Sequence, residues 1–547
     1  MQLRFSLTVW LIAAVSSLVA AQNYPITGVK VASGAEVPLR KNINAMYNYG
    51  GPQWDLYIRS LVVLYKQDPA DRLSYFQIAG IHGRPYIQWN NAGGQNSDGW
   101  LGYCPHGESL FLPWHRPYVL AYEQRLVETA LSLAQGYPAA YRDTYIKAAQ
   151  TLRSPYWDWA AAKQVPAATV PQTMTIKIPN GSGLKDYTVE NPLRYYRFPQ
   201  AAINQQFGSF ARDAQVIKCR DGSYPASANE ALGKRAYKTW VYDAFTRSTT
   251  FEQFASTGSA GTSLEQIHNA IHWDGSCGFQ FLNADYSAFD PLFMLHHTNV
   301  DRLWAYWQFI KPNEATLTRS YRGQARFSSR SNTVINANSP LQPFYAAAGR
   351  FHTPDSVKSI KNFGYTYEGL EYWRKNDATL QKDATAYINR NYVVGSVRLR
   401  KRAEDEETLT RYFAQIQVDV EQLERPCSIE LFANVTSVGN FVVMAQPATG
   451  SFFGKFSLDA AADPKETIGE NTTSVVNDLL ASLRIEIKKH DGTVIPLTNV
   501  PSLKVELENV DIQPAESTTE LPEYVHAEQR TAPKKDRHGR GPSGRRQ

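Results

Sequence analysis

Four of the chain's eleven histidines stand between residues 268 and 297, and their spacing limits what this stretch can build. His268 and His272 are four residues apart, so on a helix both side chains project from one face and can converge on one small object. His296 and His297 begin a second apolar run, which extends to Trp307 and can bring a third imidazole to the same point. Three imidazoles with an open position are typical of a catalytic metal site, because a fourth ligand closes a structural one.

A second group of histidines lies upstream. His82, His106 and His115 stand in IHGRPY, CPHGES and PWHRPY. A lone histidine is more often a satisfied core or surface residue, but two clusters of this kind indicate two metal sites. Imidazole ligands with few cysteines or carboxylates nearby suit copper, zinc or iron. The residues alone leave these three metals open.

Residues 1–21 have the organisation of a secretory signal peptide. They combine a basic start at Arg4, an apolar run and small residues at positions 19–21. No later stretch has the roughly 20 uninterrupted apolar residues that a membrane span needs. We therefore expect a secreted, soluble mature protein with no membrane partner. Its N-x-S/T sequons are candidate glycosylation sites, namely Asn180, Asn434 and Asn471.

The remaining chain is too long for one small domain and divides by pattern into a helical part and a β-rich part. Residues 22–395 are predicted to be mainly helical, with helical patterns over 42–67 and 115–135 and a loop-rich stretch at 160–235. Residues 408–512 alternate apolar and polar positions between turn residues. This alternation predicts a small antiparallel β-sandwich or barrel.

Two charged segments flank the β-rich part. Residues 396–407 are predicted to be an exposed linker, whose Lys401 and Arg402 form a dibasic pair of the kind that processing proteases cut. Residues 513–547 are polar, proline-rich and finally basic, and are predicted to be disordered. Elsewhere lysine and arginine are spread through the chain, although its net charge is +6. We therefore expect no nucleic acid partner, which would require a basic stripe with interleaved aromatic residues.

Several dispersed motifs resemble the paired-copper sites of secreted tyrosinases of filamentous fungi. They are GIHGRPY, CPH, WHRPYVLAYEQRL, HNAIH and DPLFMLHHTNVDRLWAYWQ. The resemblance covers about residues 24–370 and implies a four-helix bundle with one copper ion between each helix pair. Bundle metal sites are indeed built from inward side chains on facing helices. The expected fold is thus mainly α, with a four-helix-bundle catalytic domain followed by the β-sandwich domain.

The resemblance also implies an activity, with two copper ions as cofactor and O2 as co-substrate. The expected enzyme hydroxylates monophenols at the ortho position and oxidises o-diphenols to o-quinones, and it is made as a latent proenzyme. Its expected partners are small phenolic substrates and a processing protease. The alternatives are a catechol oxidase or o-aminophenol oxidase without monophenolase activity and, in another class, an O2 carrier of the haemocyanin type.

The family's motifs assign the metal ligands in this sequence. One copper would be held by His82, His106 and His115, and the other by His268, His272 and His297. Helical spacing shows only that His296 and His297 point about 100° apart. The choice of His297 rests on the motif and leaves His296 beside the ligands.

Other residues receive roles by the same resemblance. Glu265 and Asn269 match a pair that holds a water thought to deprotonate a bound phenol, and Phe293 matches a ring-stacking residue beside the second copper. Asp301 is expected either to accept a hydrogen bond from a ligand imidazole or to pair with Arg302 or Arg116.

The cysteines and the β-rich domain complete these expectations. The resemblance implies a thioether bond between Cys104 and His106, whereas the alternative is a plain buried thiol. Cys219 and Cys277 are then candidates for a disulfide, which leaves Cys427 free or buried. The β-rich domain is expected to be a lid that plugs the copper pocket until the linker is cut near Arg402. Phe453 is the predicted plug, with Phe452 and Phe456 as rivals.

Overall fold

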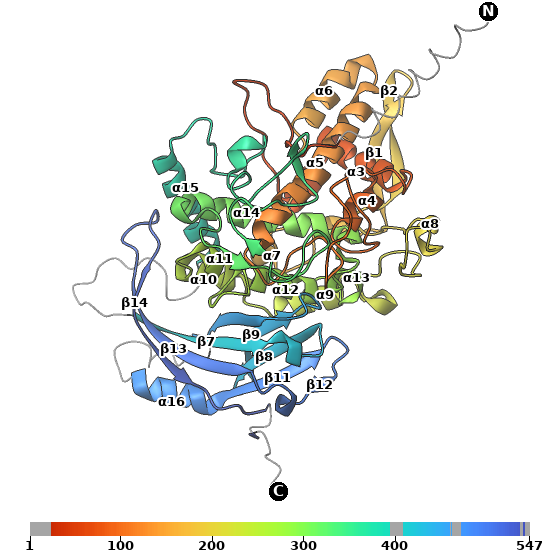
Figure 1. Ribbon diagram of the computed structural model, residues 1–547. Helices are drawn as coiled ribbons and strands as arrows, with labels where there is room; N and C mark the ends of the chain where they lie inside the picture. Colours follow the sequence, from red (N-terminus) through yellow and green to blue (C-terminus); the bar gives the residue numbers. More distant parts are fainter. Residues whose placement is uncertain (1–22, 394–408, 460, 462–471, 537–539, 542–547) are drawn as a thin grey trace, which may run out of the picture.

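The computed structural model describes residues 23–393, 409–459, 461, 472–536 and 540–541. The predicted signal peptide, the linker with Lys401 and Arg402, and Asn471 lie outside these residues. The described chain forms a helical domain and a β-rich domain, which lie against each other (Figure 1). We refer to the described residues from 409 onward as the lid. Within the described part of the chain, no helix is both long and apolar enough to span a bilayer.

The regular structure of the catalytic domain predicted from the sequence is mainly α-helical, as expected. The helices are α2 (Ile43–Tyr49), α3 (Gly51–Tyr65), α4 (Tyr75–Gly80), α5 (Phe111–Gln135), α6 (Ala139–Gln150), α7 (Trp159–Ala162), α8 (Gln200–Ile203), α9 (Ala226–Gly233), α10 (Tyr237–Arg247), α11 (Phe251–Ala255), α12 (Leu264–Asp274), α13 (Phe279–Leu282), α14 (Leu292–Ile310) and α15 (Asp377–Tyr392). Short strand pairs lie between them, namely β1 (Thr173–Asn180) with β2 (Gly183–Glu190), β3 (Tyr321–Arg322) with β4 (Val334–Ile335), and β5 (Tyr345–Ala347) with β6 (Arg350–Phe351).

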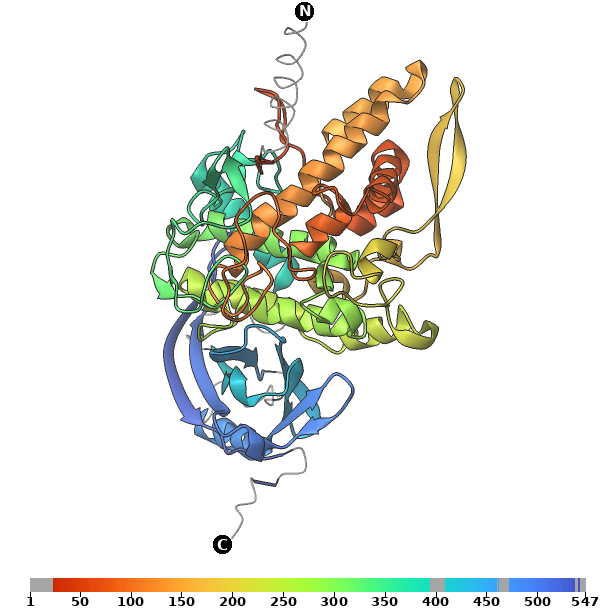
Figure 2. The same cartoon turned by 45° about the vertical axis from the view of Figure 1, so that its right-hand side comes forward.

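Helices α5, α12 and α14 place most of the predicted ligands. Helix α5 is the long rod that crosses the domain in Figure 2, and it begins four residues before His115. Pro117 is therefore inside the helix rather than at its start. Helix α12 is preceded by its N-cap Ser263, whose side chain accepts a hydrogen bond from the Gln266 amide, so the N-terminal turn is capped. Both α12 and α14 are buried along almost their whole length, and they carry four of the histidines of the site described below.

The hairpin β1–β2 lies in the stretch predicted to be rich in loops. Its strands pair from Thr173 with Glu190 to Asn180 with Gly183, and the hairpin projects from the domain (Figure 2). Met174 and Ile176 alternate with exposed residues and are buried, so the strand has the two-residue period of a half-buried sheet. The sequence shows this strand as a short alternation of apolar and polar residues bounded by proline and glycine residues, so the hairpin could have been predicted.

The lid is built from two antiparallel sheets, which agrees with the predicted β-rich domain. One has the strand order β10-β7-β13-β14 and the other β12-β11-β8-β9. The elements are β7 (Leu409–Asp419), β8 (Cys427–Ala433), β9 (Thr436–Val443), β10 (Ser451–Ser457), α16 (Thr472–Ser482), β11 (Leu483–Lys489), β12 (Val494–Ile495), β13 (Lys504–Gln513) and β14 (Glu523–Thr531).

Strand β14 corrects the prediction that residues 513–547 are disordered. It pairs with β13 from Glu506–Thr531 to Gln513–Glu523. The Tyr524 hydroxyl accepts a hydrogen bond from Arg411, 3.0 Å away. The composition of this segment is polar because most of β14 is exposed, and the backbone pairing with β13 supplies the order that its side chains do not.

Buried ion pairs join the lid to the catalytic domain. Arg411 on β7 contacts Asp243 on α10 at 2.5 Å, and both side chains are almost fully buried. Glu508 on β13 pairs with Arg247 on α10 and with Lys455 on β10. Such pairs fix the register of an interface, because separating either partner leaves a charge without its counterion.

Candidate metal centre

The second histidine cluster is formed by α12 and α14. His268 and His272 lie one turn apart on α12, and His296 and His297 are adjacent on α14. One ring nitrogen from each of the four histidines lies within 4.8 Å of the others, and all four are buried. The predicted i, i+4 convergence is therefore present in the structure.

The ring nitrogens of this cluster face one another in a way that calls for a cation. The Nδ1–H of His272 donates to the Phe281 carbonyl at 2.5 Å, and that of His268 donates to Asn269 Oδ1 at 2.8 Å. Their Nε2 atoms therefore carry lone pairs, yet they are only 3.0 Å apart. His297 Nε2 lies 3.3 Å from His268 Nε2. Lone pairs this close repel unless a metal ion lies between them, and such spacings suit nitrogen ligands about 2.0 Å from a metal.

The first cluster is assembled from loops and one helix. His82 lies in the turn after α4, His106 in a loop, and His115 in the second turn of α5. Their ring centroids are 5.4 to 5.8 Å apart. The Nδ1–H of His82 donates to Ala284 O at 3.0 Å and that of His115 to Phe111 O at 2.7 Å. Their Nε2 atoms are buried and have no hydrogen-bond partner among the described residues, so they are free to bind a metal.

The two clusters face each other. The rings of His115 and His297 stack with centroids 4.4 Å apart, and those of His106 and His268 are 5.7 Å apart. Burial lowers the pKa of every histidine in the clusters, to about 4 for His82 and about 3 for His272. The imidazoles are therefore neutral at physiological pH, as metal ligands must be.

Cys104 belongs to the first cluster. The distances among the Cys104 sulfur, one ring nitrogen of His82 and one ring nitrogen of His106 are all within 4.8 Å. Burial raises the pKa of the Cys104 thiol. The thiol therefore keeps its proton unless the sulfur binds a metal or forms a covalent bond. This position agrees with the predicted bond between Cys104 and His106, which stays a prediction.

His296 is the unusual member of the second cluster. Its side chain has no exposed surface, and neither ring nitrogen has a hydrogen-bond partner among the described residues. The ring lies parallel to His268 at 4.8 Å and contacts Trp159 on the other side at 6.2 Å. His297, in contrast, faces the first cluster, which agrees with its selection as the ligand.

Phe293 forms one wall between the clusters. Its ring centroid lies 4.2 Å from that of His297 and 5.0 Å from that of His82. The side chain has no exposed surface. An aromatic ring fixed between two ligand rings restricts the shape of anything that enters.

Glu265 and Asn269 lie at the start of α12, one turn apart. Glu265 accepts hydrogen bonds from the Gly107 amide and from Ser256 and Thr257. Burial raises the pKa of Glu265 to about 7, although the hydrogen bonds from Gly107 and Thr257 act in the opposite direction. A carboxyl group that titrates near neutrality is suited to proton transfer.

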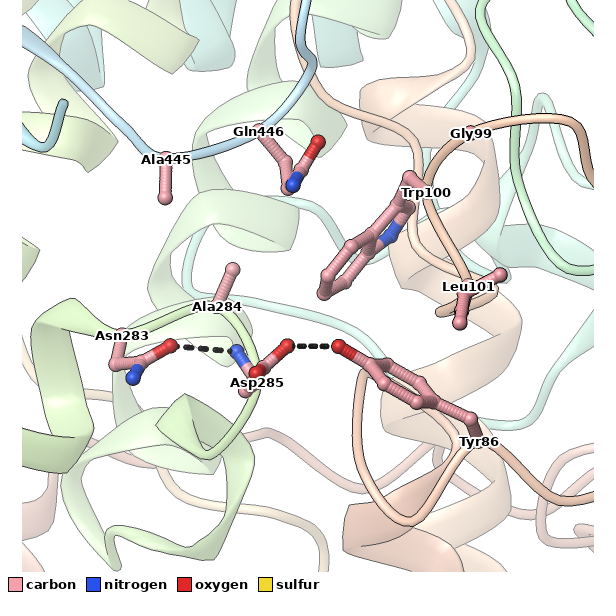
Figure 3. Close-up of a pocket in the computed structure, with 9 residues that line it drawn as sticks. All are labelled: Tyr86, Gly99, Trp100, Leu101, Asn283, Ala284, Asp285, Ala445 and Gln446. Carbon is pink, nitrogen blue, oxygen red and sulfur yellow. Dashed lines mark hydrogen bonds between the residues drawn. The ribbon is translucent and has the colours of Figure 1, made fainter. Parts of the chain in front are cut away.

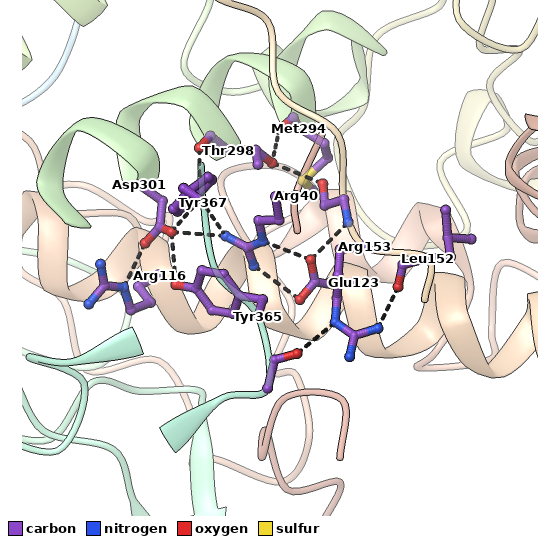
Figure 4. Close-up of polar contacts among 12 residues, drawn as sticks. Arg40, Arg116, Glu123, Leu152, Arg153, Met294, Thr298, Asp301, Tyr365 and Tyr367 are labelled. Carbon is purple, nitrogen blue, oxygen red and sulfur yellow. Dashed lines mark hydrogen bonds and ion pairs between the residues drawn. The ribbon is translucent and has the colours of Figure 1, made fainter. Parts of the chain in front are cut away.

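Asp301 does not contact a histidine among the described residues, so the first of its two predicted roles is wrong. Its carboxylate accepts hydrogen bonds from Arg116 at 2.6 Å, Arg40 at 2.9 Å and the hydroxyls of Tyr365 and Tyr367 (Figure 4). The alternative pairing with Arg116 is confirmed, and the pairing with Arg302 is wrong, because Arg302 contacts Asp158. Asp301 is one turn beyond His297, but two guanidinium groups compete for it more strongly than a neutral imidazole does.

Of the three phenylalanines considered as a plug, Phe452 is the one that packs against Gly107, the neighbour of His106, and the identity of the plug stays a prediction. A Cβ atom added to Gly107, the neighbour of His106, would lie 2.2 Å from the tip of the Phe452 ring. Phe453 is half-buried and contacts the catalytic domain through its backbone amide. Phe456 packs against Trp240 at 5.2 Å. In a β-strand successive side chains point to opposite faces, so only one of two neighbouring phenylalanines can face the histidines.

A pocket of about 240 Å³ remains at the seam between lid and catalytic domain. Trp100 and Tyr86 line it from one side, Asp285 from below and Gln446 of the lid from above (Figure 3). Ala284, whose carbonyl accepts the hydrogen bond from His82, is also part of its wall. The outer wall of the first cluster is thus shared by the two domains.

The remaining cysteines behave as predicted. Cys219 and Cys277 form a disulfide, and Cys427 is free and buried. The disulfide ties the loop after α12 to the segment before α9, so it braces the end of the helix that carries His268 and His272.

A family model, described as the common central domain of tyrosinase, matches residues 72–310. The chain contains a tyrosinase domain. All eight cluster residues lie within the matched range, and the two clusters of the tyrosinase domain fit two copper ions. They are His82, Cys104, His106, His115, His268, His272, His296 and His297.

The chain has relatives among the tyrosinases of fungi. The chain is 32% identical over 382 residues to a tyrosinase of Podospora anserina, which covers 64% of this chain and 66% of that protein. It is 32% identical over 409 residues to a tyrosinase of Neurospora crassa, which covers 68% of this chain and 58% of that protein. The chain thus spans less than two thirds of the length of either relative.

A solved structure shares the fold of both domains. The structure of latent and active mushroom tyrosinase superposes with a TM-score of 0.77 at 21% identity, over 92% of this chain and 98% of that chain. At this identity the likeness concerns the fold. It includes the lid, because the superposition extends well beyond the tyrosinase domain.

Several functional groups of the tyrosinase domain were missed in the sequence. The carbonyls of Ala284, Phe111 and Phe281 fix three imidazoles, but backbone atoms leave no residue-type signal. Thr257, which donates twice to Glu265, is eight residues before it in a loop with no periodic pattern. Only the fold brings these groups to the site.

Proposed function

We propose that this protein is a latent di-copper phenol oxidase that hydroxylates monophenols at the ortho position and oxidises o-diphenols to o-quinones with O2. The observation that carries the proposal is the convergence of unpaired imidazole nitrogens from two clusters that face each other across 4.4 Å at His115 and His297. The first copper is assigned to His82, His106 and His115, and the second to His268, His272 and His297. When bound, the two ions supply the paired one-electron changes that O2 reduction and phenol oxidation require.

The protein's own residues hold and orient the phenol. Phe293 stands between His82 and His297, so an aromatic substrate that reaches the metals packs against its ring. The burial of both clusters excludes water, which strengthens every polar contact inside the site. The rings of Phe111, Phe281 and Phe293 pack against the histidines, which favours an aromatic substrate.

Glu265 and Asn269 are assigned to proton handling. Hydroxylation of a monophenol begins with loss of the phenolic proton, and Glu265 has a pKa near neutrality at the edge of the second cluster. Asn269 is adjacent to the ligand His268 and bonds its Nδ1. The presence of this pair favours a true tyrosinase over a catechol oxidase or o-aminophenol oxidase.

The lid is assigned to latency. It buries Phe452 against Gly107 and therefore blocks access from the side of His106. Proteolysis near Lys401 and Arg402 would cut the covalent connection between the two domains and allow the lid to dissociate. Secretion, a Cys104–His106 thioether, and glycosylation at the exposed Asn180 and Asn434 and at Asn471 belong to the same proposal.

Oxygen uptake on three substrates tests the function. Copper-loaded protein, intact and after cleavage in the linker, is given a monophenol, an o-diphenol and an o-aminophenol. We expect little uptake before cleavage and uptake with the first two substrates after it. Two diphenols reduce one O2 to two waters, so the ratio of quinone formed to O2 consumed is a built-in check. Reversible O2 binding without turnover would instead identify a carrier of the haemocyanin type.

A further inference from the structure

Among the described residues, Thr257 makes the most hydrogen bonds to the Glu265 carboxylate. Its amide and its hydroxyl both donate to Oε2, at 2.9 and 3.0 Å. Ser256 Oγ donates to the same oxygen at 3.2 Å, and the Gly107 amide donates to Oε1 at 2.7 Å. A carboxylate offers about four acceptor positions, so these four bonds nearly saturate it.

These bonds are not the cap of a helix. Helix α12 is capped by Ser263, whose hydroxyl accepts a hydrogen bond from the Gln266 amide. Thr257 precedes that cap by six residues and is fully buried. Its two hydrogen bonds therefore serve the Glu265 side chain rather than the end of the helix.

The lid binds the other side of the same loop. The Phe453 amide donates to the Thr257 carbonyl at 2.7 Å. Two residues further along β10, the Lys455 amide donates to Gln266 Oε1 at 2.9 Å and its carbonyl accepts from Gln266 Nε2 at 3.1 Å. Strand β10 is the edge of its sheet, so the catalytic domain occupies the side that would otherwise be open.

The lid also contacts the second member of the proton-handling pair. Asn269 Nδ2 donates to the Val442 carbonyl on β9 at 3.3 Å, while its Oδ1 accepts from His268. With the lid docked, both polar atoms of Asn269 are thus in use. Glu265 Oε2 accepts three hydrogen bonds, and the lid takes one of the two amide hydrogens of Asn269, so the docked lid limits the positions left for a water or a phenol hydroxyl.

We propose that Thr257 is a positioning residue for Glu265 in monophenol hydroxylation, and that the docked lid acts on the proton-handling pair through Thr257 and Asn269. The inference rests on the proposed function. It goes beyond blocking of the pocket, because it predicts that the lid also controls which hydrogen bonds the pair can make. Release of the Thr257 carbonyl by Phe453 lets the loop move and frees an acceptor position on Glu265.

Substitution of Thr257 tests its role in the cleaved, copper-loaded enzyme. Thr257→Val keeps the side-chain volume and the amide but removes the hydroxyl donor, and Thr257→Ser restores that donor. Thr262→Val is the matched control, because the Thr262 hydroxyl donates to the Lys455 carbonyl and does not contact Glu265. We expect Thr257→Val to lower kcat for a monophenol about tenfold with little change in kcat for an o-diphenol.

The outcomes separate this inference from the proposed function. Thr257→Ser with the wild-type ratio of the two rates, and Thr262→Val with the same ratio, would support it. Equal losses on both substrates in Thr257→Val, or no loss on either, would overturn it while the oxidase function stands. A cleaved wild-type enzyme that oxidises the diphenol and leaves the monophenol untouched would also overturn it. Absence of turnover on both substrates would instead remove the proposed function.

Hydrogen exchange tests the action of the lid in the intact chain. Phe453→Pro removes the amide that donates to Thr257, and proline is tolerated where an edge-strand amide points away from its sheet. Phe453→Ala is the matched control, because it also lacks the ring but keeps the amide. We expect amides of residues 254–264 to exchange about tenfold faster in Phe453→Pro than in Phe453→Ala. Equal exchange in the two variants would show that the lid does not hold this loop.

Discussion

The two histidine clusters bind the same kind of ion but are built by different means. In the second cluster, all four histidines come from α12 and α14, so the helical repeat sets their spacing. In the first, His82 and His106 come from loops, and only His115 is on a helix. The first cluster therefore needs anchors from elsewhere, such as the Ala284 carbonyl that follows α13 and bonds His82. Regular structure sets the spacing of the second cluster, in which the Phe281 carbonyl also anchors His272, whereas the first cluster depends mainly on tertiary contacts.

Loss of a helical ligand should have the largest effect. In His272→Ala we expect copper content to fall from two ions per chain to one and oxygen uptake on every phenol to disappear, because each three-histidine set holds one ion. Metal analysis by mass spectrometry and oxygen uptake measure the two effects. His526→Ala, on the exposed face of β14, is the control. Two ions in His272→Ala would show that His296 substitutes for the lost ligand.

Glu265 and Asn269, to which we assign proton handling, lie on α12 beside the second cluster, and Glu265→Gln tests this assignment. We expect the rate on a monophenol to fall about 10²- to 10⁴-fold, because an amide cannot accept the phenolic proton. The rate on an o-diphenol should change little, and copper content should stay at two ions. Steady-state kinetics on matched substrates, with metal analysis, are the measurement. A parallel fall on both substrates would contradict the assignment of Glu265.

Asp301 ties the helices of the two clusters together, since it is on α14 and contacts Arg116 on α5. Asp301→Asn should lower the free energy of unfolding by about 3–5 kcal/mol, because it breaks a buried charge network. Denaturant unfolding at neutral pH measures the loss. A change below about 1 kcal/mol would mean that Arg40 and Arg116 are satisfied by their other partners.

The same carboxylate gives a pH dependence of known sign. Burial alone would raise the pKa of Asp301, but Arg116 and Arg40 outweigh burial and hold the pKa below its usual value. The folded-state pKa is thus below that of the unfolded chain, so this stabilisation is complete above about pH 4 and is lost as the pH falls further. Unfolding midpoints between about pH 5 and pH 3 should fall less steeply in Asp301→Asn than in the wild type.

The lid places Phe452 against Gly107 beside the loop-built cluster, so Phe452 should control access from that side. In the intact chain, Phe452→Ala should raise oxygen uptake on a small catechol several-fold, because the ring that abuts Gly107 is removed. Phe453→Ala is the control, because the Phe453 side chain is half-buried and points to the opposite face of β10 from Phe452. Equal activity of the two variants would mean that Phe452 does not block access more than Phe453 does.

The smallest effect concerns the anchors of the first cluster. In metal-free protein, His82→Ala should cost about 1–3 kcal/mol of stability, because it leaves the buried Ala284 carbonyl without its donor. His297→Ala should cost less through this route, because its Nδ1 has no partner among the described residues. Thermal unfolding of both apo-variants measures the difference. The reverse order would contradict the distinction between anchored and helix-borne ligands.

The sequence by itself determined the helical cluster and the general plan of the chain. The i, i+4 pair His268 and His272 and the apolar run after His297 have the period of a helix, so their convergence follows from local geometry. The alternation of apolar and polar residues in the β-rich part could also be predicted from the sequence, because the two-residue period of a strand is local. The disulfide between Cys219 and Cys277 was likewise expected, because assigning Cys104 to a thioether left these two cysteines as candidates to pair.

Only the tertiary structure decided which groups complete the site. The pairing of Asp301 with two arginines, the facing of Phe452 rather than Phe453, and the order in β14 each depend on what another segment presents at that point. Thr257, Ala284 and Phe281 act largely through backbone groups, which every residue type carries. Periodicity reports which face of an element is buried, but the partner on that face comes from distant parts of the chain and is chosen by packing.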